Sequence, residues 1–370
     1  MSTRFASITT LLAATLALCA PMNSTASTVY LGNYADAIQA ADFDSATGQL
    51  TRGRPVAALA RASFLTKSAD GRFLYAVAEG GGGSLHAFAI GGDGALTTLN
   101  TRPSQGSGPC DIALSPDGSL IAAANYSGGS AIVYRVALDG TLAEPAGFFQ
   151  HTHAAKVFPG RQKEAHAHGV TWSPDGRLLL VPDLGGDRIY AYASATAATG
   201  GQMVVNPSQA WLEVPPGSGP RHAQFSPDGR NLYVINELGN TVSVAAYDAE
   251  AGTFALVETV TTLPPEGFAG ATKTAEIVVH PAGHTVYASN RGHETLAVFA
   301  RDAATGRLTP RGHVPVPANP RHFALSPDAR WLLSAGQDTS TVAVFSVAAD
   351  GALTPAGEPF ATPKPVCVRF

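Results

Sequence analysis

The sequence predicts an all-β fold, a seven-bladed β-propeller, from three observations. One kind of turn recurs along the chain, short β-rich segments flank each turn, and the two ends of the chain carry complementary fragments of the same unit. The composition agrees, because 39 glycines and 26 prolines without a collagen period are typical of many turns joining short strands. A hydrophobic fraction of 45% is sufficient for a substantial core.

Six similar turns divide the chain. Pro presets φ for a turn, Asp bonds to the nearby backbone, and Gly tolerates a positive φ. The turns recur every 46 to 58 residues, which is close to the spacing of propeller blades. They are Ala69–Gly71, Ser115–Gly118, Ser173–Gly176, Ser226–Gly229, His280–Gly283 and Ser326–Ala329.

Each turn lies between two apolar, β-rich segments, and a third strand that often ends in an aromatic residue follows. The stretch His166–Tyr192 is representative: strand, tight turn, strand, loop, strand, with two histidines opening its first segment. Each unit therefore supplies an inner strand, a second and third strand, and a less regular fourth.

The two ends of the chain together supply a seventh unit. Thr28–Tyr34 resembles a second strand without its inner strand, and Lys364–Phe370 resembles an inner strand without its second strand. If the last strand completes the first blade, six units become seven and the ring has no open edge. We therefore expect residues 27–370 to form one propeller domain.

The first residues differ from the rest. Arg4 precedes the apolar run Ile8–Ala20, and small residues follow, which predicts a signal peptide over residues 1–26. The run is too short for an ordinary membrane span. Lipidation at Cys19 is a weaker alternative, because Leu18 is bulkier than a lipobox usually accepts. We expect an exported protein, periplasmic or secreted, without a membrane span.

Charge and cysteine content restrict the partners and the cross-links. A formal net charge of −4 and a pI near 6.2 give no basic footprint, so nucleic acid is not an expected partner. We expect a monomer. After removal of the signal peptide only Cys110 and Cys367 remain, and one blade should separate them by more than the roughly 7 Å that a disulfide permits between Cα atoms. Both are predicted to be free, buried thiols.

Chemically reactive residues concentrate where inner strands begin and second strands end. In a ring of such hairpins these positions meet at one mouth of the central channel, so a pocket is expected there. Arginines and histidines converging on one mouth suggest an anionic or strongly polar ligand, because unpaired buried charge is costly. The alternative, strongest for Asp183, is that such residues satisfy backbone groups. The candidates are Glu79, Tyr126, His166, His168, Asp183, Arg221, His222, Glu237, Arg291, Arg321 and His322.

Six motifs give the sequence a resemblance to the lactonase family of seven-bladed propellers. They are Ala165–Gly169, Val181–Gly185, Gly219–His222, Asn236–Leu238, Ser289–Gly292 and Asn319–His322. The family includes one type of 6-phosphogluconolactonase and the fungal 3-carboxy-cis,cis-muconate lactonizing enzyme. The resemblance implies a catalytic group like that proposed for the muconate enzymes, which carries over onto His168, Arg221, Glu237 and Arg291.

The leading hypothesis is hydrolysis of a lactone at the channel mouth, without a metal or another cofactor. His168 or Glu237 would take a proton from water, and Arg221 and Arg291 would hold the carbonyl oxygen or a carboxylate or phosphate of the substrate. His166, Arg321, His222, His322, Asp183, Glu79 and Tyr126 are the expected substrate-binding residues. A signal peptide does not match the intracellular sugar-phosphate pathway.

Three alternatives stay open. One is cycloisomerisation of an unsaturated dicarboxylate by the same residues, and another is a non-enzymatic propeller that binds a ligand or partner. The third is a zinc site made of His151, His153, His166 and His168. The zinc site is less favoured, because His151 and His153 lie in a long insertion, where histidines are commonly solvated.

Overall fold

The computed structural model describes residues 26–80, 82–194 and 201–370. Within these ranges the regular secondary structure consists of β-strands, and no helix is long and apolar enough to cross a membrane. The predicted signal peptide, residues 1–26, lies outside the described residues apart from Ala26, as does Cys19.

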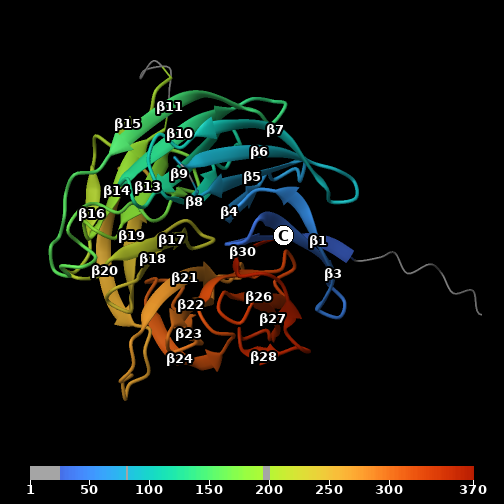
Figure 1. Cartoon of the computed structure of the whole chain (residues 1–370). Coiled ribbons are helices and arrows are strands. Elements are labelled where there is room, and N and C mark those ends of the chain that lie inside the picture. The colour runs from blue at the N-terminus through green and yellow to red at the C-terminus, as the bar shows by residue number, and fades with distance from the viewer. Residues whose placement is uncertain (1–25, 81, 195–200) are drawn as a thin grey trace, which may run out of the picture.

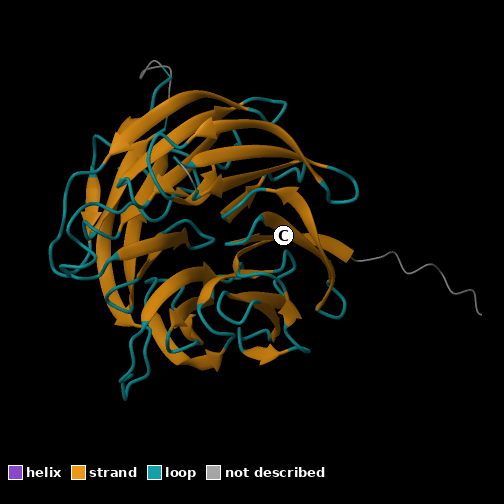
Figure 2. Ribbon diagram, in the orientation of Figure 1, coloured by secondary structure: helices purple, strands orange, loops and turns teal. Residues whose placement is uncertain are grey.

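Seven sheets are arranged in a ring around a central axis (Figure 1, Figure 2), which confirms the predicted propeller. The closing blade joins both ends of the chain: β30 (Pro365–Arg369) pairs antiparallel with β1 (Ala26–Asn33), and β2 (Ala37–Asp44) and β3 (Gln49–Ala58) follow outward. The expected closure by the last strand is therefore confirmed.

The other six blades follow in chain order. They are β4 (Ala62–Lys67), β5 (Phe73–Ala78), β6 (Ser84–Ile90) and β7 (Leu96–Pro103); β8 (Pro109–Leu114), β9 (Leu120–Asn125), β10 (Ser130–Val136) and β11 (Leu142–Gln150); β12 (Thr171–Trp172), β13 (Leu178–Asp183), β14 (Arg188–Ala193), β15 (Val204–Val205) and β16 (Trp211–Glu213); β17 (Pro220–Phe225), β18 (Asn231–Asn236), β19 (Thr241–Asp248) and β20 (Thr253–Thr261); β21 (Lys273–Val279), β22 (Thr285–Arg291), β23 (Thr295–Arg301) and β24 (Leu308–Pro315); and β25 (Pro320–Leu325), β26 (Trp331–Gly336), β27 (Thr341–Val347), β28 (Leu353–Pro355) and β29 (Phe360–Ala361). The first strands of successive blades contact one another, so they line the channel.

Buried tyrosines on the second strands join neighbouring blades. Tyr30, Tyr75, Tyr233 and Tyr287 are at most 1% exposed, and each hydroxyl donates to a glycine carbonyl in the outer turn of the next blade at 2.7 to 3.0 Å. A buried phenol needs such a partner, since an unsatisfied hydroxyl is costly in an apolar core. Packing between blades and these hydrogen bonds together hold the ring.

The blade formed by β12–β16 departs from the pattern expected from the sequence. Its inner strand was expected to begin at His166, but β12 contains only Thr171–Trp172, and the preceding segment makes an isolated bridge between Ala167 and Asp183. Pro182 on the partner strand has no N–H to donate, so the ladder is interrupted there. The amide of His166 instead donates to Asp183 Oδ1 at 2.8 Å. The histidine segment is therefore held by this side chain and by two backbone hydrogen bonds, His168 N–H to Pro182 O and Leu184 N–H to His166 O, both 2.9 Å, rather than by a regular ladder.

Both described cysteines behave as predicted. Cys110, on β8, and Cys367, on β30, are buried and free.

Candidate active site

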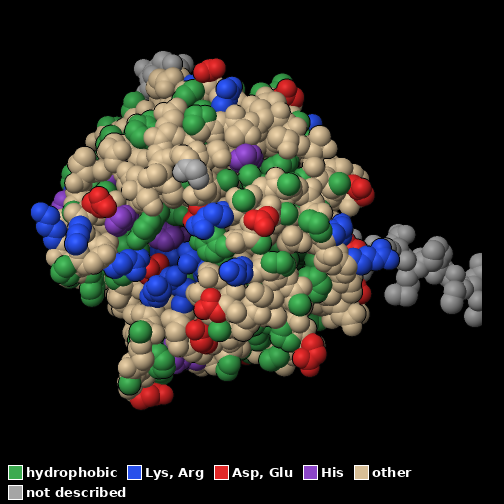
Figure 3. Space-filling view, in the orientation of Figure 1, with side chains coloured by type: hydrophobic (Ala, Val, Ile, Leu, Met, Phe, Trp, Pro, Cys, Tyr) green, Lys and Arg blue, Asp and Glu red, His purple; other side chains and the backbone are tan. Residues whose placement is uncertain are grey.

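The residues at which inner strands begin and second strands end surround a cavity of about 250 Å³. Six of the predicted site residues line it: Glu79, Tyr126, His168, Glu237, Arg291 and Arg321. The other lining residues are Tyr34, Gly108, Cys110, Ser127, Arg161 and Lys273. Lys and Arg side chains gather near the centre of the ring on the face shown in Figure 3. This cavity is called the mouth cavity below.

Glu237 is the electrostatic centre of the mouth cavity. It follows β18 and is 2% exposed, and its Oε2 lies 2.7 Å from Arg291 Nη2 and 3.2 Å from Arg221 Nε. Its Oε1 accepts a hydrogen bond from Arg161 Nη2 at 2.7 Å. Burial alone would raise the pKa of Glu237, but Arg291, Arg221 and Arg161 outweigh burial and hold the pKa well below its usual value. Glu237 is therefore a stable carboxylate and a weak base.

Of the two predicted catalytic arginines, one lines the mouth cavity and the other is buried behind it. Arg291 ends β22, lines the cavity and also donates from Nη2 to the Thr274 carbonyl at 2.6 Å. Burial lowers the pKa of Arg291 to about 10, so the guanidinium stays charged at neutral pH. Arg221, on β17, is 1% exposed and lies behind Glu237 rather than on the cavity wall. Arg221 can hold Glu237, while Arg291 can also reach a ligand.

His168 faces Glu237 across a gap. The distance from His168 Nε2 to Glu237 Oε2 is 3.8 Å, too long for a direct hydrogen bond and short enough for one water to contact both atoms. Burial, and then the charge of Arg221, lowers the pKa of His168 well below 6.5, so the imidazole is neutral at pH 7.

Cys110 contacts both the carbonyl and the ring of His168. Its Sγ lies 3.4 Å from the His168 carbonyl and 3.6 Å from His168 Nδ1. Burial raises the pKa of Cys110, so the thiol keeps its proton and can donate it to the carbonyl. In that arrangement the sulfur can accept from Nδ1–H, and Nε2 is then free to act as a base.

Arg161 is a site residue that the sequence analysis missed. It lies in the segment 151–170 between β11 and β12, and its Nη2 contacts Tyr126 Oη at 3.2 Å as well as Glu237. The repeat could not identify Arg161, because this insertion has no counterpart in the other blades. Lys273, at the start of β21, was missed for a simpler reason: no motif marks it.

A buried network fixes the insertion that carries Arg161. His151 is 4% exposed, and its Nδ1 lies 2.6 Å from Asp183 Oδ2 while its Nε2 lies 2.8 Å from Tyr192 Oη. The expectation that the insertion histidines are solvated is therefore wrong for His151. Gly185 allows the same insertion to approach closely, since a Cβ at Gly185 would clash with the Glu164 carbonyl. Arg161 consequently enters the cavity from a segment held at several points.

Four predicted substrate-binding residues lie outside the mouth cavity, and two of them, Asp183 and His166, lie behind its wall. Asp183 is fully buried in the His151 network, where its Oδ1 also accepts the amide of Gly186 at 2.9 Å. The His166 ring stacks on Tyr126 with a centroid distance of 4.4 Å. Both support the site from behind. Across the described ranges, no group of three or more His, Cys, Asp or Glu side chains is placed to hold a metal ion.

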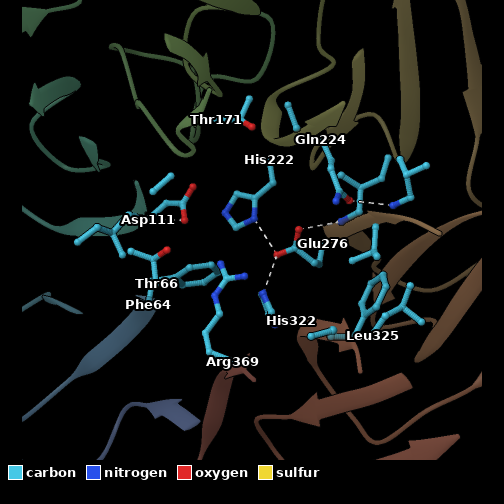
Figure 4. A pocket seen from close by; sticks show the side chains of 18 of the residues that line it. Phe64, Thr66, Asp111, Thr171, His222, Gln224, Glu276, His322, Leu325 and Arg369 are labelled. Carbon is cyan, nitrogen blue, oxygen red and sulfur yellow. Dashed lines mark hydrogen bonds and ion pairs between the residues drawn. The ribbon is translucent and has the colours of Figure 1, made fainter. Parts of the chain in front are cut away.

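His222 and His322 line a second, larger cavity of about 510 Å³, shown in Figure 4. Its wall includes Pro281 and Pro327 from the repeated turns, so it opens toward the opposite end of the blades. Both histidines point at Glu276: His222 Nδ1 lies 2.9 Å and His322 Nε2 lies 3.7 Å from Glu276 Oε2. This cavity is called the channel cavity below.

A repeated β-bulge separates residues that are adjacent in sequence. In β8, β17 and β25 the register shifts at the second residue, so Cys110, Arg221 and Arg321 are the extra residues of their strands. Bulges re-aim side chains next to active sites. The bulged residues lie at the mouth, while the next residues, Asp111, His222 and His322, line the channel cavity. The prediction of one shared mouth for Arg221–His222 and Arg321–His322 therefore does not match the structure.

Known proteins resemble this chain over nearly its whole length. A 6-phosphogluconolactonase of Bacillus subtilis (strain 168) is 29% identical over 349 residues, covering 92% of this chain and 97% of the relative. A 6-phosphogluconolactonase of Formosa agariphila is 29% identical over 329 residues, covering 86% and 91%.

Solved structures agree with these relatives. The periplasmic gluconolactonase of Pseudomonas aeruginosa has a TM-score of 0.86 and 31% identity, covering 92% of this chain and 98% of that one. The family described as "Lactonase, 7-bladed beta-propeller" matches residues 28–370. The chain therefore belongs to the lactonase family of seven-bladed β-propellers.

Proposed function

We propose that this protein hydrolyses an anionic lactone in the mouth cavity, using its own side chains as acid, base and anion holder. The observation that carries the proposal is the 3.8 Å gap between a neutral histidine, His168, and a permanently ionised carboxylate, Glu237. A water beside these two atoms, on the cavity side, could hydrogen-bond to both the imidazole nitrogen and the carboxylate.

The proposed reaction begins with this water. His168 Nε2 takes one proton while the water oxygen bonds to the lactone carbonyl carbon. The charge of Glu237, 3.8 Å from the same nitrogen, stabilises the imidazolium that forms. The ring C–O bond then breaks, the imidazolium returns its proton to the departing oxygen, and the hydroxy acid leaves. Positioned proton transfer of this kind contributes about 10²–10⁴-fold to a rate.

Positive charge in the mouth cavity supports an anionic substrate. Arg161, Lys273, Arg291 and Arg321 line it, against the carboxylates of Glu79 and Glu237. The excess positive charge suits a carboxylate or phosphate on the lactone, and it also suits the oxyanion that develops at the carbonyl. The name of the Pseudomonas aeruginosa neighbour supports a sugar lactone in the periplasm, and that location agrees with the proposed signal peptide at residues 1–26.

A substrate panel tests the proposal. Protein comprising residues 27–370 is given neutral sugar lactones, their phosphates, a muconolactone and a carboxymuconate, with His168→Ala as the inactive control. We expect ring opening of at least one lactone by the wild type and none by the variant. Consumption of the muconate alone would indicate a cycloisomerase. Turnover of nothing, together with a thermal shift on adding phosphate, would indicate a binding propeller.

A further inference from the structure

We propose that His222 and Glu276, in the channel cavity, are positioning residues that hold Arg221 against Glu237 in the mouth cavity. This inference rests on the proposed function, because it assigns a role in the same reaction. It gives a purpose to a buried acid–base cluster that the hydrolysis mechanism does not otherwise use.

A continuous series of polar contacts joins the two cavities. Glu276 Oε2 lies 2.9 Å from His222 Nδ1, and His222 Nε2 lies 3.3 Å from Arg221 Nη1. Arg221 Nε then lies 3.2 Å from Glu237 Oε2. A single residue, Arg221, thus separates the acid–base cluster seen in Figure 4 from the carboxylate of the mouth cavity.

The direction of these contacts requires one tautomer of His222. Arg221 can only donate, so His222 Nε2 must accept and carries no proton. The proton then lies on Nδ1 and points at the Glu276 carboxylate, which accepts it. Glu276 also accepts the amide of Ile277 at 3.0 Å, which fixes the carboxylate in place. Glu276 therefore orients His222, and His222 orients Arg221.

Arg221 needs this support because two carboxylates compete for it. The guanidinium is 1% exposed, burial disfavours its charge and lowers its pKa, and both Glu237 and Glu276 act on it electrostatically. Arg221 Nη1 also donates to the Ala275 carbonyl, so His222 is the second partner of this nitrogen. Without His222, the guanidinium could turn about that remaining contact toward Glu276. Glu237 would then lose one of its cations and its alignment with His168.

The protein contains its own control for this idea. His322 approaches Glu276 from the other side, with Nε2 at 3.7 Å, and its Nδ1 accepts the Val368 amide at 3.2 Å. Within the described residues no hydrogen bond joins His322 to Arg221, whose charge acts on His322 only at longer range. Both His222 and His322 also pack edge-on against Phe64, at 5.2 and 5.3 Å between ring centroids. A purely structural role would make the two histidines equally important.

The test compares His222→Gln, His222→Asn, Glu276→Gln and His322→Gln by kcat and KM on the lactone that the wild type opens fastest. Gln reaches the position of Nε2 and can still accept from Arg221, whereas the shorter Asn reaches only Glu276. We expect H222N to lose about tenfold in kcat with little change in KM, the effect of one lost hydrogen bond to a charged group. E276Q should lose less, because the Gln oxygen can still accept the His222 Nδ1 proton, although without the carboxylate charge. H222Q and H322Q should stay within about twofold of wild type, because the Arg221 contact survives in both.

Equal losses in H222Q and H222N, or an H322Q loss as large as that of H222N, would overturn the proposal. A second measurement does not depend on turnover: ¹⁵N NMR of histidine-labelled protein should show His222 as the Nδ1–H tautomer in the wild type. Finding the Nε2–H tautomer would also overturn it. If the wild type opens no lactone but the tautomer is as expected, the proposed function fails and the contact series stands.

Discussion

The mouth and channel cavities each contain a buried carboxylate among basic side chains, but the bases differ in kind. Glu237 faces Arg161, Arg221 and Arg291, which stay charged at any physiological pH. Glu276 faces two histidines, and burial lowers the pKa of His322 to about 3, so that histidine is neutral at pH 7. The mouth therefore has cations to spare for a ligand, whereas the channel cluster satisfies its own carboxylate. Two similarly buried carboxylates can therefore have different roles: Glu237 lies in a cavity that can bind a ligand, and Glu276 aligns its neighbouring side chains.

The largest expected effect is on His168. His168→Asn should lower kcat by about 10²–10⁴-fold, because it removes the proposed base. Stability should change little, since no carboxylate loses a direct hydrogen bond. Steady-state kinetics and urea unfolding on the same samples measure both quantities. A variant that keeps wild-type kcat would exclude His168 as the base.

Removing the charge of Glu237 should affect both activity and stability. Glu237→Gln leaves three arginines without their shared carboxylate, and breaking a buried ion pair typically destabilises by about 3–5 kcal/mol. We also expect kcat to fall by roughly 10²-fold, because the imidazolium loses its counter-charge. Glu276→Gln is the comparison: its loss in kcat should be smaller, as given above, and it should also destabilise less, because the partners of Glu276 are histidines. Equal destabilisation by the two substitutions would contradict the distinction between the cavities.

Arg161 offers a test of ligand charge. Its side chain is 35% exposed, so Arg161→Ala should raise KM by about tenfold for a lactone that carries a carboxylate or phosphate, the low end for a charged hydrogen bond. A neutral sugar lactone should be affected much less. Arg311→Ala on the outer strand β24 is the matched control. An equal rise in KM for both lactones would argue against Arg161 as the residue that recognises the anionic group.

A last prediction concerns the channel cluster and the pH dependence of stability. Because the folded-state pKa of His322 lies near 3, below its ordinary 6.5, the unfolded chain binds a proton first as the solution is acidified. Stability contributed by neutral His322 is present above about pH 6.5 and is lost progressively toward pH 3. His322→Gln should flatten this part of the unfolding free energy, measured by denaturant titration at several pH values. An unchanged pH dependence would show that His322 is not buried as a neutral group.

Much of the fold could be predicted from local patterns. The six turns recur because Pro, Asp and Gly set the backbone of each hairpin, and the fragments at the chain ends pair as β1 and β30. The same patterns predicted which residues begin inner strands, such as His168 and Arg321, and which end second strands, such as Glu237 and Arg291, and all four line one cavity. They did not predict how deeply each side chain is buried or which of the two cavities it lines.

The sequence by itself determined the ring, its closure and the residue types that gather near the axis, because these depend on short-range turn chemistry and on strand periodicity. Only the tertiary structure decided that Arg221 and His222 serve different cavities, since a bulge depends on how two strands pair. It also decided that Arg161 reaches Glu237 from an insertion, because that contact spans 76 positions in the chain and depends on the buried anchor at His151. Local propensity determines strands and turns, whereas contacts between blades decide which side chains meet.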